Sequence, residues 1–243
     1  MPLLEIEDVS VRFGGRTALS SVTLQVAAGS VTGLIGPNGA GKTTLFNCIT
    51  GLQRPDGGTV RLDGVHLGGY SPSQRARAGM ARTFQRLELF LSMSVRDNIR
   101  VAGDIVRANG RRRFDVEAET DRVLELTGLG DIAHEDVSAV PPGRARVVEV
   151  ARALMVQPRL LLLDEPASGQ TEHETEQFAA LLTSLAADGM GICLVEHDLP
   201  LVMGLCSRVH VLDHGVLIAS GTPAEVQQSP AVLDAYIGAG GAA

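Results

Sequence analysis

The sequence predicts a mixed α/β fold: a core of parallel strands, an antiparallel β subdomain near the N-terminus, and a helical subdomain. Apolar residues alternate with polar ones at Leu3 to Val11 and at Thr23 to Val26, which indicates antiparallel strands. Leu160 to Leu163 and Ile192 to Val195 are uninterrupted apolar runs, as in parallel strands covered on both faces. Helical spacing of apolar residues fills much of the sequence between these two groups of strands. We therefore expect one domain over residues 1–243.

The first half of the chain predicts a strand, a loop and a helix, followed by a hairpin. Val31 to Ile35 is a short apolar run that ends at a glycine, and Thr43 to Thr50 has the character of a helix. Val60 to Leu62 and Val65 to Leu67, separated by Asp63-Gly64, indicate a hairpin.

The helical subdomain is expected at residues 87–155, inserted between strands of the core. Apolar residues recur every three or four positions in Val116 to Leu126 and again in Val147 to Leu154. Near the C-terminus, Gly215 to Gly221 reads as a strand. Thr222-Pro223-Ala224-Glu225 then has the form of a capped helix start, with proline at the first helical position.

Composition excludes some classes of function. The formal net charge of −7 argues against nucleic acid as a partner. The chain has three cysteines, Cys48, Cys193 and Cys206, and no two of them form a Cys-x-x-Cys motif. This pattern fits buried core thiols in a reducing compartment. The arginines at positions 107 and 111–113 could contact phospholipid head groups or a partner, although a solvated helix end or loop is the simpler interpretation.

No segment predicts export or a membrane span. Glu5, Glu7 and Asp8 stand where a signal peptide needs an uncharged apolar stretch. No run approaches the roughly 18 apolar residues that a spanning helix needs. We therefore expect any membrane role to come through partner proteins.

A phosphate-binding loop follows the strand at residues 31–35. Its glycines let backbone N–H groups curl around phosphates, Lys42 reaches the β- and γ-phosphates, and the Thr43 hydroxyl binds Mg²⁺. The positive N-terminal end of the following helix then points at the anion. Lys42 is the only lysine among 21 lysine and arginine residues, and its compact ammonium fits between phosphate oxygens better than a guanidinium. The loop consists of Gly36, Pro37, Asn38, Gly39, Ala40, Gly41, Lys42, Thr43 and Thr44.

Adjacent carboxylates end the apolar run at residues 160–163. A buried strand that ends in Asp164 and Glu165 delivers both groups to the crevice where a nucleotide binds. Asp164 would hold Mg²⁺ directly or through water. Glu165 is placed to polarise a water for in-line attack on the γ-phosphate.

Three further positions are weaker signals. His197 stands at the end of the next buried run, although a lone histidine is more often a packed or surface residue. The Gln85 amide could complete the shell of Mg²⁺ or of the attacking water. Phe13 precedes Gly14-Gly15 and could stack on adenine, or it could pack within its strand.

Taken together, the order of these motifs resembles the ATP-binding subunit of ABC transporters over essentially the whole chain. Four stretches look like the branched-chain (hydrophobic) amino acid importer subgroup, and importers of urea and short amides share them. They are Val11-Arg12-Phe13-Gly14-Gly15-Arg16-Thr17-Ala18, Thr44-Leu45-Phe46-Asn47, Gly79-Met80-Ala81-Arg82-Thr83-Phe84-Gln85 and Ala235-Tyr236-Ile237-Gly238.

This resemblance implies a function and a role for each residue. The chain would hydrolyse ATP with Mg²⁺ as a peripheral subunit on the cytoplasmic side of the cell membrane. Phe13 would stack on adenine, Gln85 would be the hinge that senses the γ-phosphate and Mg²⁺, Glu165 the catalytic base and His197 the γ-phosphate switch. The helical subdomain would dock on membrane permease subunits, and a solute-binding protein would be an indirect partner.

Two segments depart from the family pattern. The signature, typically Leu-Ser-Gly-Gly-Gln or Leu-Ser-Tyr-Gly-Gln, is here Val140-Pro141-Pro142-Gly143-Arg144. In the family its serine hydroxyl and backbone N–H groups contact the γ-phosphate held by the opposite subunit of a head-to-tail dimer. Pro141 has neither group, and Pro142 also lacks the N–H. Ser168-Gly169-Gln170-Thr171 also departs, since the family usually ends this loop with aspartate or asparagine.

The altered signature leads to a hypothesis about the partner. The chain would pair with a second, non-identical ATP-binding subunit, whose intact signature completes the site at Lys42, while the reciprocal site is weak or silent. The alternative is a regulatory ATP-binding module that uses the same fold without powering transport.

Overall fold

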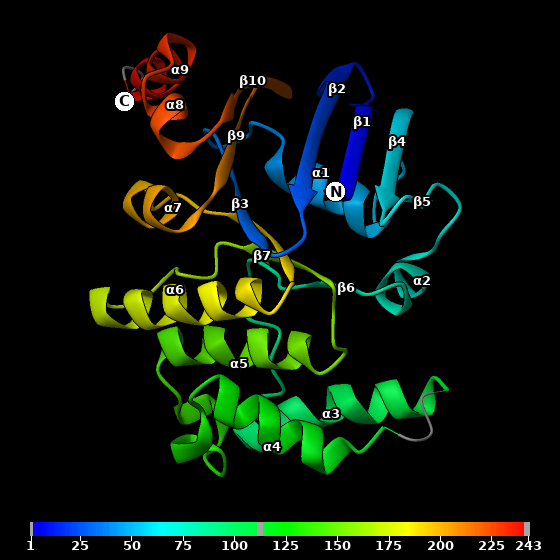
Figure 1. Ribbon diagram of the computed structural model, residues 1–243, viewed down its shortest axis with the longest axis vertical. Coiled ribbons are helices and arrows are strands. Elements are labelled where there is room, and N and C mark those ends of the chain that lie inside the picture. The colour runs from blue at the N-terminus through cyan, green and yellow to red at the C-terminus, as the bar shows by residue number, and fades with distance from the viewer. Residues whose placement is uncertain (1, 111–113, 241–243) are drawn as a thin grey trace.

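The structure consists of two β-sheets with helices packed around and below them (Figure 1). It is a computed structural model that describes residues 2–110 and 114–240, with side chains described up to Tyr236. The arginine cluster expected at 111–113 lies outside the described residues. The mixed α/β fold class predicted from the sequence is confirmed.

The smaller sheet is antiparallel and lies at the N-terminal end of the chain (Figure 1). Its strand order is β2-β1-β4-β5. Alternation of buried and exposed residues sets the register, so that Leu4 lies opposite both Val26 and Leu62. The predicted strands and the hairpin at residues 60–67 are therefore confirmed. The strands are β1 (Pro2–Phe13), β2 (Arg16–Ala27), β4 (Gly57–Leu62) and β5 (Val65–His66).

The larger sheet has six strands in the order β10-β9-β3-β8-β7-β6. All neighbouring pairs are parallel except β9 with β10. The carboxyl ends of β3, β7 and β8 therefore meet at one edge of the sheet, as a nucleotide crevice requires. The strands are β3 (Ser30–Ile35), β6 (Met80–Arg82), β7 (Leu160–Asp164), β8 (Gly191–Val195), β9 (Arg208–Asp213) and β10 (Val216–Gly221).

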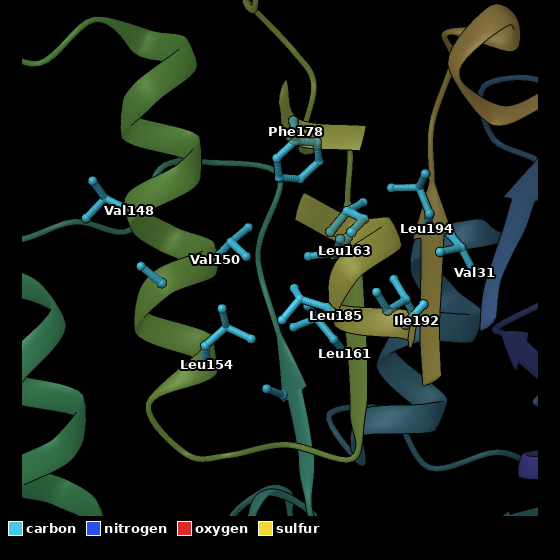
Figure 2. Packing of buried hydrophobic residues seen from close by; sticks show 14 of the residues in the cluster. Val31, Val148, Val150, Leu154, Leu161, Leu163, Phe178, Leu185, Ile192 and Leu194 are labelled. Carbon is cyan, nitrogen blue, oxygen red and sulfur yellow. The ribbon is translucent and has the colours of Figure 1, made fainter. Parts of the chain in front are cut away.

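Strand β7 is buried on both faces, as its continuous run of leucines predicts. Successive side chains of a strand point to opposite faces. Leu160 and Leu162 accordingly join the core between the two sheets, whereas Leu161 and Leu163 join the core below the larger sheet. Figure 2 shows Leu163 beside Phe178 and Leu161 beside Leu185, two residues of the helix that packs against this face.

The helices divide between these two cores. Helix α1 (Lys42–Thr50) buries Leu45, Phe46 and Ile49 in the core that the two sheets share. Helix α6 (Glu172–Ala187) lies against the other face of the larger sheet, and α5 (Pro142–Leu154) lies below α6 (Figure 1). Helices α3 (Val95–Ala108) and α4 (Val116–Leu126) lie below α5. The other α-helices are α2 (Pro72–Arg77), α7 (Leu199–Leu205), α8 (Pro223–Gln227) and α9 (Pro230–Gly240).

Three of these helices fall inside the segment predicted to be helical. Helix α4 has the bounds predicted for Val116 to Leu126, and α5 begins five residues before the predicted Val147 because Pro142 starts its first turn. Residues 87–94, which the prediction included, precede α3 and form no helix. None of the helices in the described parts of the chain is long and apolar enough to span a membrane.

The three cysteines are buried and free, as expected for core thiols. Burial raises the pKa of the Cys48 thiol to about 11 and that of the Cys206 thiol to about 12. A thiol with a raised pKa holds little thiolate at neutral pH and is a poor nucleophile. The cysteines therefore contribute packing.

Candidate functional site

The loop between β3 and α1 depends on glycine at two positions. Gly36 has a φ of 148°, and a Cβ there would lie 2.0 Å from the carbonyl oxygen of Leu212. Gly41 has a φ of 107° and is the N-cap residue of α1, where a Cβ would lie 2.8 Å from the carbonyl oxygen of Ala18. Because Gly41 has no side chain to cap the helix, the first N–H groups of α1 are left for an anion.

Lys42 lies folded over this loop. Its Nζ donates hydrogen bonds to the carbonyl oxygens of Gly36 and Pro37, at 2.5 and 3.0 Å. Burial lowers the pKa of Lys42, and the nearby carboxylates of Glu165 and Asp164 partly offset this shift. The ammonium is therefore held at the base of the loop by neutral carbonyls that a phosphate can replace.

A cavity of about 620 Å³ opens above the loop. Asn38, Gly39, Ala40, Gly41, Lys42, Thr43 and Thr44 line it, together with Phe13, Gln85, Glu165 and His197. Gly36 and Pro37 do not line it, because they lie below Lys42 and accept its hydrogen bonds. The sequence analysis missed five residues that also line the cavity: Arg16, Thr17, Ala18, Val195 and His214. A volume of this size suits a small-molecule ligand.

The three polar side chains predicted from separate segments meet in this cavity. Glu165 follows β7 with a φ of 51°, which turns its carboxylate away from the strand direction. Nε2 of His197 lies 2.9 Å from Oε1 of Glu165, and Nε2 of Gln85 donates to Oε2 of Glu165 at 3.1 Å. These two hydrogen bonds fix the position of the Glu165 carboxylate. Its side chain is 22% exposed, so the carboxylate is still accessible from the cavity.

Asp164 does not line the cavity. Its carboxylate lies behind Glu165 and forms a buried ion pair with Arg82, with Nη2 3.0 Å from Oδ2. The Arg82 guanidinium also lies near the rings of Phe46 and Phe84, and its Nη1 donates to Oδ1 of Asn47. The sequence analysis missed this role for Arg82, although the residue stands three positions before Gln85.

Glu196 is a second residue that sequence reasoning missed. Its buried carboxylate accepts hydrogen bonds from the backbone N–H groups of Ala167 and His197, at 2.8 and 3.0 Å. Burial raises the pKa of Glu196, and these backbone donors oppose that shift. Glu196 thereby ties the loop after Glu165 to the loop that carries His197. Glu196 lies directly between the buried end of β8 and His197, and this position in the sequence could have indicated its role at the site.

Phe13 projects from the end of β1 at the mouth of the cavity. The residue is 53% exposed, so its ring is not buried by packing against neighbouring strands. An exposed ring beside a cavity offers a flat apolar face to a heteroaromatic base.

The donor set of the cavity suits a hard cation. Within the described residues no three histidine, cysteine, aspartate or glutamate side chains form a metal cluster, so a cation here would need ligand oxygens from a bound anion. The hydroxyl of Thr43 and the amide oxygen of Gln85 belong to residues that line the cavity, and both are ligands of the kind that Mg²⁺ prefers. The Asp164 carboxylate lies behind them in its ion pair with Arg82, so it would reach such a cation through water.

The segment at residues 140–144 forms the start of α5. Pro141 is the N-cap residue of the helix and Pro142 is its first helical residue. Because both are prolines, neither has a backbone N–H group to offer at this end of the helix. Gly143 lies against Glu174, since a Cβ added at Gly143 would be 2.9 Å from Oε2 of that carboxylate. Arg144 forms two hydrogen bonds with the Asp131 carboxylate, at 2.6 and 2.7 Å, so its charge is already engaged.

Thr171 ends the second segment that departs from the expected pattern. Its hydroxyl accepts a hydrogen bond from the backbone of Glu174, whose carboxylate in turn accepts one from the backbone N–H of Thr171. This arrangement is a capping box at the start of α6. Thr171 therefore serves as the N-cap of α6, a role that aspartate or asparagine also fills.

Comparison with known proteins gives concordant matches over the whole chain. A family model described as ABC transporter matches residues 19–168, and one described as branched-chain amino acid ATP-binding cassette transporter matches residues 216–242. The chain is 40% identical to the high-affinity branched-chain amino acid transport ATP-binding protein LivG of Escherichia coli (strain K12). It is 38% identical to the corresponding protein BraF of Pseudomonas aeruginosa. Both alignments cover 98% of each chain.

Solved structures show the same fold. A nucleotide-free ATP-binding cassette from an ABC transporter has a TM-score of 0.87 at 27% identity, covering 97% of this chain and 99% of that chain. An ATP-binding cassette of an ABC transporter in its ADP conformation has a TM-score of 0.88 at 29% identity, covering 98% of this chain and 99% of that chain.

Proposed function

Because this chain belongs to the ABC transporter family of ATP-binding cassettes, we propose that it powers an importer for branched-chain amino acids or for related small solutes such as urea and short amides. The cassettes of this family are ATPases whose hydrolysis is coupled to transport. The observation that carries the proposal is the convergence of Lys42, Glu165 and His197 on one cavity. The match of residues 216–242 to the branched-chain amino acid subgroup supports the class of solute.

Within this proposal each polar side chain has a chemical task. Lys42 and the N–H groups at the start of α1 hold the phosphates. Glu165 accepts a proton from the attacking water, and His197, at 2.9 Å from it, fixes the orientation of its carboxylate. Phe13 stacks on the adenine. Thr43 and Gln85 would hold Mg²⁺ in the cavity, with Asp164 behind them bound through water, and the ion would supply positive charge opposite the phosphates.

The loop before α3 is the proposed contact with the membrane permease. It exposes five large apolar side chains, and Leu91 is 65% exposed. An exposed apolar cluster of this kind marks a protein interface more often than free surface. The chain would bind there as a peripheral subunit on the cytoplasmic side of the membrane, and a solute-binding protein would act on it indirectly. The five residues are Phe84, Leu87, Phe90, Leu91 and Met93.

We further propose that the chain works in an asymmetric pair with a second, non-identical ATP-binding subunit. Pro141 and Pro142 remove the hydroxyl and two of the N–H groups that a signature segment gives to its neighbour's nucleotide. Arg144 is bound to Asp131 and is not free to replace them. The site at Lys42 keeps all its own groups, so one of the two composite sites would be active.

The pairing is tested by measuring ATP hydrolysis of the purified chain alone and after reconstitution with the second subunit. We expect slow, non-cooperative hydrolysis by the chain alone and fast hydrolysis by the pair. Replacing the signature serine of the second subunit by proline should then abolish the activity of the pair. Vigorous, cooperative hydrolysis by the chain alone as a homodimer would refute the asymmetry.

The transport function is tested by affinity purification of Glu165→Gln with ATP, followed by identification of the co-purifying subunits. The wild-type assembly, reconstituted in vesicles, should import leucine, isoleucine and valine or, alternatively, urea and short amides. If purification from native membranes recovers no permease, the chain is instead a regulatory ATP-binding module, which the altered segment at residues 140–144 would permit.

A further inference from the structure

Three charged residues on one face of α5 contact the loop that carries Gln85. Arg146, Glu149 and Arg152 are spaced by three positions, so they lie on neighbouring turns of the same face. Two of their side chains are nearly buried, with 12% of Arg146 and 6% of Glu149 exposed. Charged side chains are rare at such positions unless they have partners.

All three side chains hydrogen-bond to the backbone of the loop. Arg146 donates from Nη1 to the carbonyl oxygen of Phe84 at 3.2 Å and from Nη2 to that of Gln85 at 2.6 Å. The Glu149 carboxylate accepts from the N–H of Glu88 at 2.8 Å, and Arg152 donates to the carbonyl oxygen of Glu88. The position of residues 84–88 is therefore set by α5, whichever side chains the loop carries.

Two of the three residues also bind each other, and the third makes a second contact with the loop. Arg146 forms an ion pair with Glu149, with Nη1 3.0 Å from Oε2, and the Arg152 guanidinium lies over the ring of Phe90. Burial raises the pKa of Glu149, and the hydrogen bonds from Glu88 and Arg146 oppose this shift. Buried ion pairs add little net stability compared with apolar packing, so their main effect is to fix one geometry.

The far end of the loop is held by α3, not by the nucleotide core. Asn98, which is fully buried, accepts from the N–H of Phe90 at 2.8 Å and donates to the carbonyl oxygen of the same residue at 3.0 Å. The backbone of residues 84–90 is thus attached at both ends to helices of the inserted segment. Gln85 alone reaches back from the loop to Glu165.

We propose that Arg146, Glu149 and Arg152 form a backbone clamp that positions Gln85 at the nucleotide cavity, with Arg146 as the positioning residue that acts through Gln85. The proposal rests on the role proposed above for Gln85. Any displacement of α5 relative to the core moves the Gln85 carbonyl with it and changes the distance between the Gln85 amide and the Glu165 carboxylate.

The test uses Arg146→Lys in the assembled transporter. Lysine keeps the positive charge but cannot bridge two carbonyl oxygens and a carboxylate with a planar fork. We expect kcat to fall about 10²-fold, the loss typical of a group misplaced by about 1 Å. Arg96→Lys is the matched control, because Arg96 also makes two ion pairs in the inserted helices, with Glu117 and Asp121, but does not contact the loop.

A double-mutant cycle with Gln85→Ala separates positioning from a general structural role. If Arg146 acts through Gln85, Arg146→Lys lowers kcat in the wild-type background and has no further effect when Gln85 is already alanine. Additive losses in the two backgrounds would refute the proposal. If Gln85→Ala alone hydrolyses ATP at the wild-type rate, the proposed role of Gln85 fails, and with it the positioning claim.

Hydrogen exchange of the full chain tests the clamp without any activity. The amide of Glu88 donates to Glu149, which Arg146 holds in place, so it should exchange about tenfold faster or more in Arg146→Lys than in the wild type. It should be unchanged in Arg96→Lys. If Arg146→Lys does not fold, Arg152→Lys at the other end of the clamp takes its place in both measurements. Unchanged exchange at Glu88 in a folded variant would overturn the clamp while leaving the proposed function intact.

Discussion

Arg82 and Asp164 form a buried ion pair at the base of the candidate site, with Nη2 3.0 Å from Oδ2. The two side chains are 6% and 3% exposed, and 82 positions in the sequence separate them. A second bond from Arg82 to Asn47 links the pair to the helix that follows the phosphate loop. The pair therefore joins α1, β6 and β7 directly beneath the nucleotide cavity.

Removing Arg82 should destabilise the protein strongly. Arg82→Met leaves the Asp164 charge buried without a partner, which typically costs about 3–5 kcal/mol. The double variant Arg82→Met, Asp164→Asn removes both charges and should recover much of this loss. Urea unfolding measures the free energies. Arg159→Met is the control, because its ion pair with Asp63 is half exposed and should contribute less than about 1 kcal/mol. Equal losses in Arg82→Met and Arg159→Met would contradict this account.

Glu165→Gln should bind ATP but turn over slowly. The substitution keeps the size of the side chain and one acceptor oxygen, while it removes the group that takes a proton from water. General-base catalysis contributes about 10²–10⁴-fold, so kcat should fall by that factor with little change in ATP affinity. Glu176→Gln, at an exposed position on α6, is the matched control. Hydrolysis at the wild-type rate by Glu165→Gln would remove this residue from its proposed role.

The sole lysine allows a direct measurement of one site pKa. Because the chain has no other lysine, selective ¹³Cε labelling gives a single lysine NMR signal, that of Lys42. Burial should place its pKa below the ordinary value of 10.5. Glu165→Gln removes a carboxylate that raises this pKa and should therefore lower it further. A midpoint at or above 10.5 in the nucleotide-free chain would show that Lys42 is not held as described.

His210 should make the protein less stable in mild acid. Its ring is buried and Nε2 donates to the carbonyl oxygen of Gln25. Burial lowers the pKa of His210, the hydrogen bond to Gln25 partly opposes this shift, and the nearby Arg208 adds to it. The unfolded chain therefore binds the proton first, so stability is lost as the pH falls below about 6.5, with a slope of at most about 1.4 kcal/mol per pH unit.

The variant His210→Gln isolates this contribution. Between pH 7.5 and pH 5.5 its free energy of unfolding should fall less than that of the wild type, as measured in urea. His214→Gln, at a position whose side chain is 91% exposed, is the control and should keep the wild-type pH dependence. The same pH dependence in all three proteins would exclude His210 as the source.

Leu91→Glu should prevent assembly with the permease. A charge placed in the centre of an apolar contact should weaken binding by about 2 kcal/mol or more, roughly 30-fold. ATP binding by the isolated chain should not change, because Leu91 does not line the nucleotide cavity. Leu52→Glu is the control, since Leu52 is similarly exposed but lies after α1, away from the loop. Co-purification measures assembly with the permease, and an equilibrium binding assay measures ATP affinity. Normal assembly of Leu91→Glu would move the docking surface elsewhere.

Much of the fold could be read from local patterns. Strand alternation in β1 and β2, the leucine run of β7 and the helical spacing of α4 each reflect burial within one segment, so each is visible in the sequence alone. The bounds of the helical subdomain, residues 87–155, remain a prediction. Residues 87–94 form a loop before α3, and helical spacing was predicted only for stretches that follow it.

The phosphate loop, the carboxylates that end β7 and the loss of two N–H donors at Pro141 and Pro142 were all visible in the amino-acid sequence. These features depend on a residue's own backbone limits and on its immediate neighbours. Which distant groups meet was visible only after the elements had been packed together. Arg82 reaches Asp164 because β6 and β7 are adjacent parallel strands. Arg146 reaches the Gln85 carbonyl, 61 positions away, because α5 packs beneath the larger sheet. Such contacts arise from the packing of whole elements, for which no single segment carries a signal.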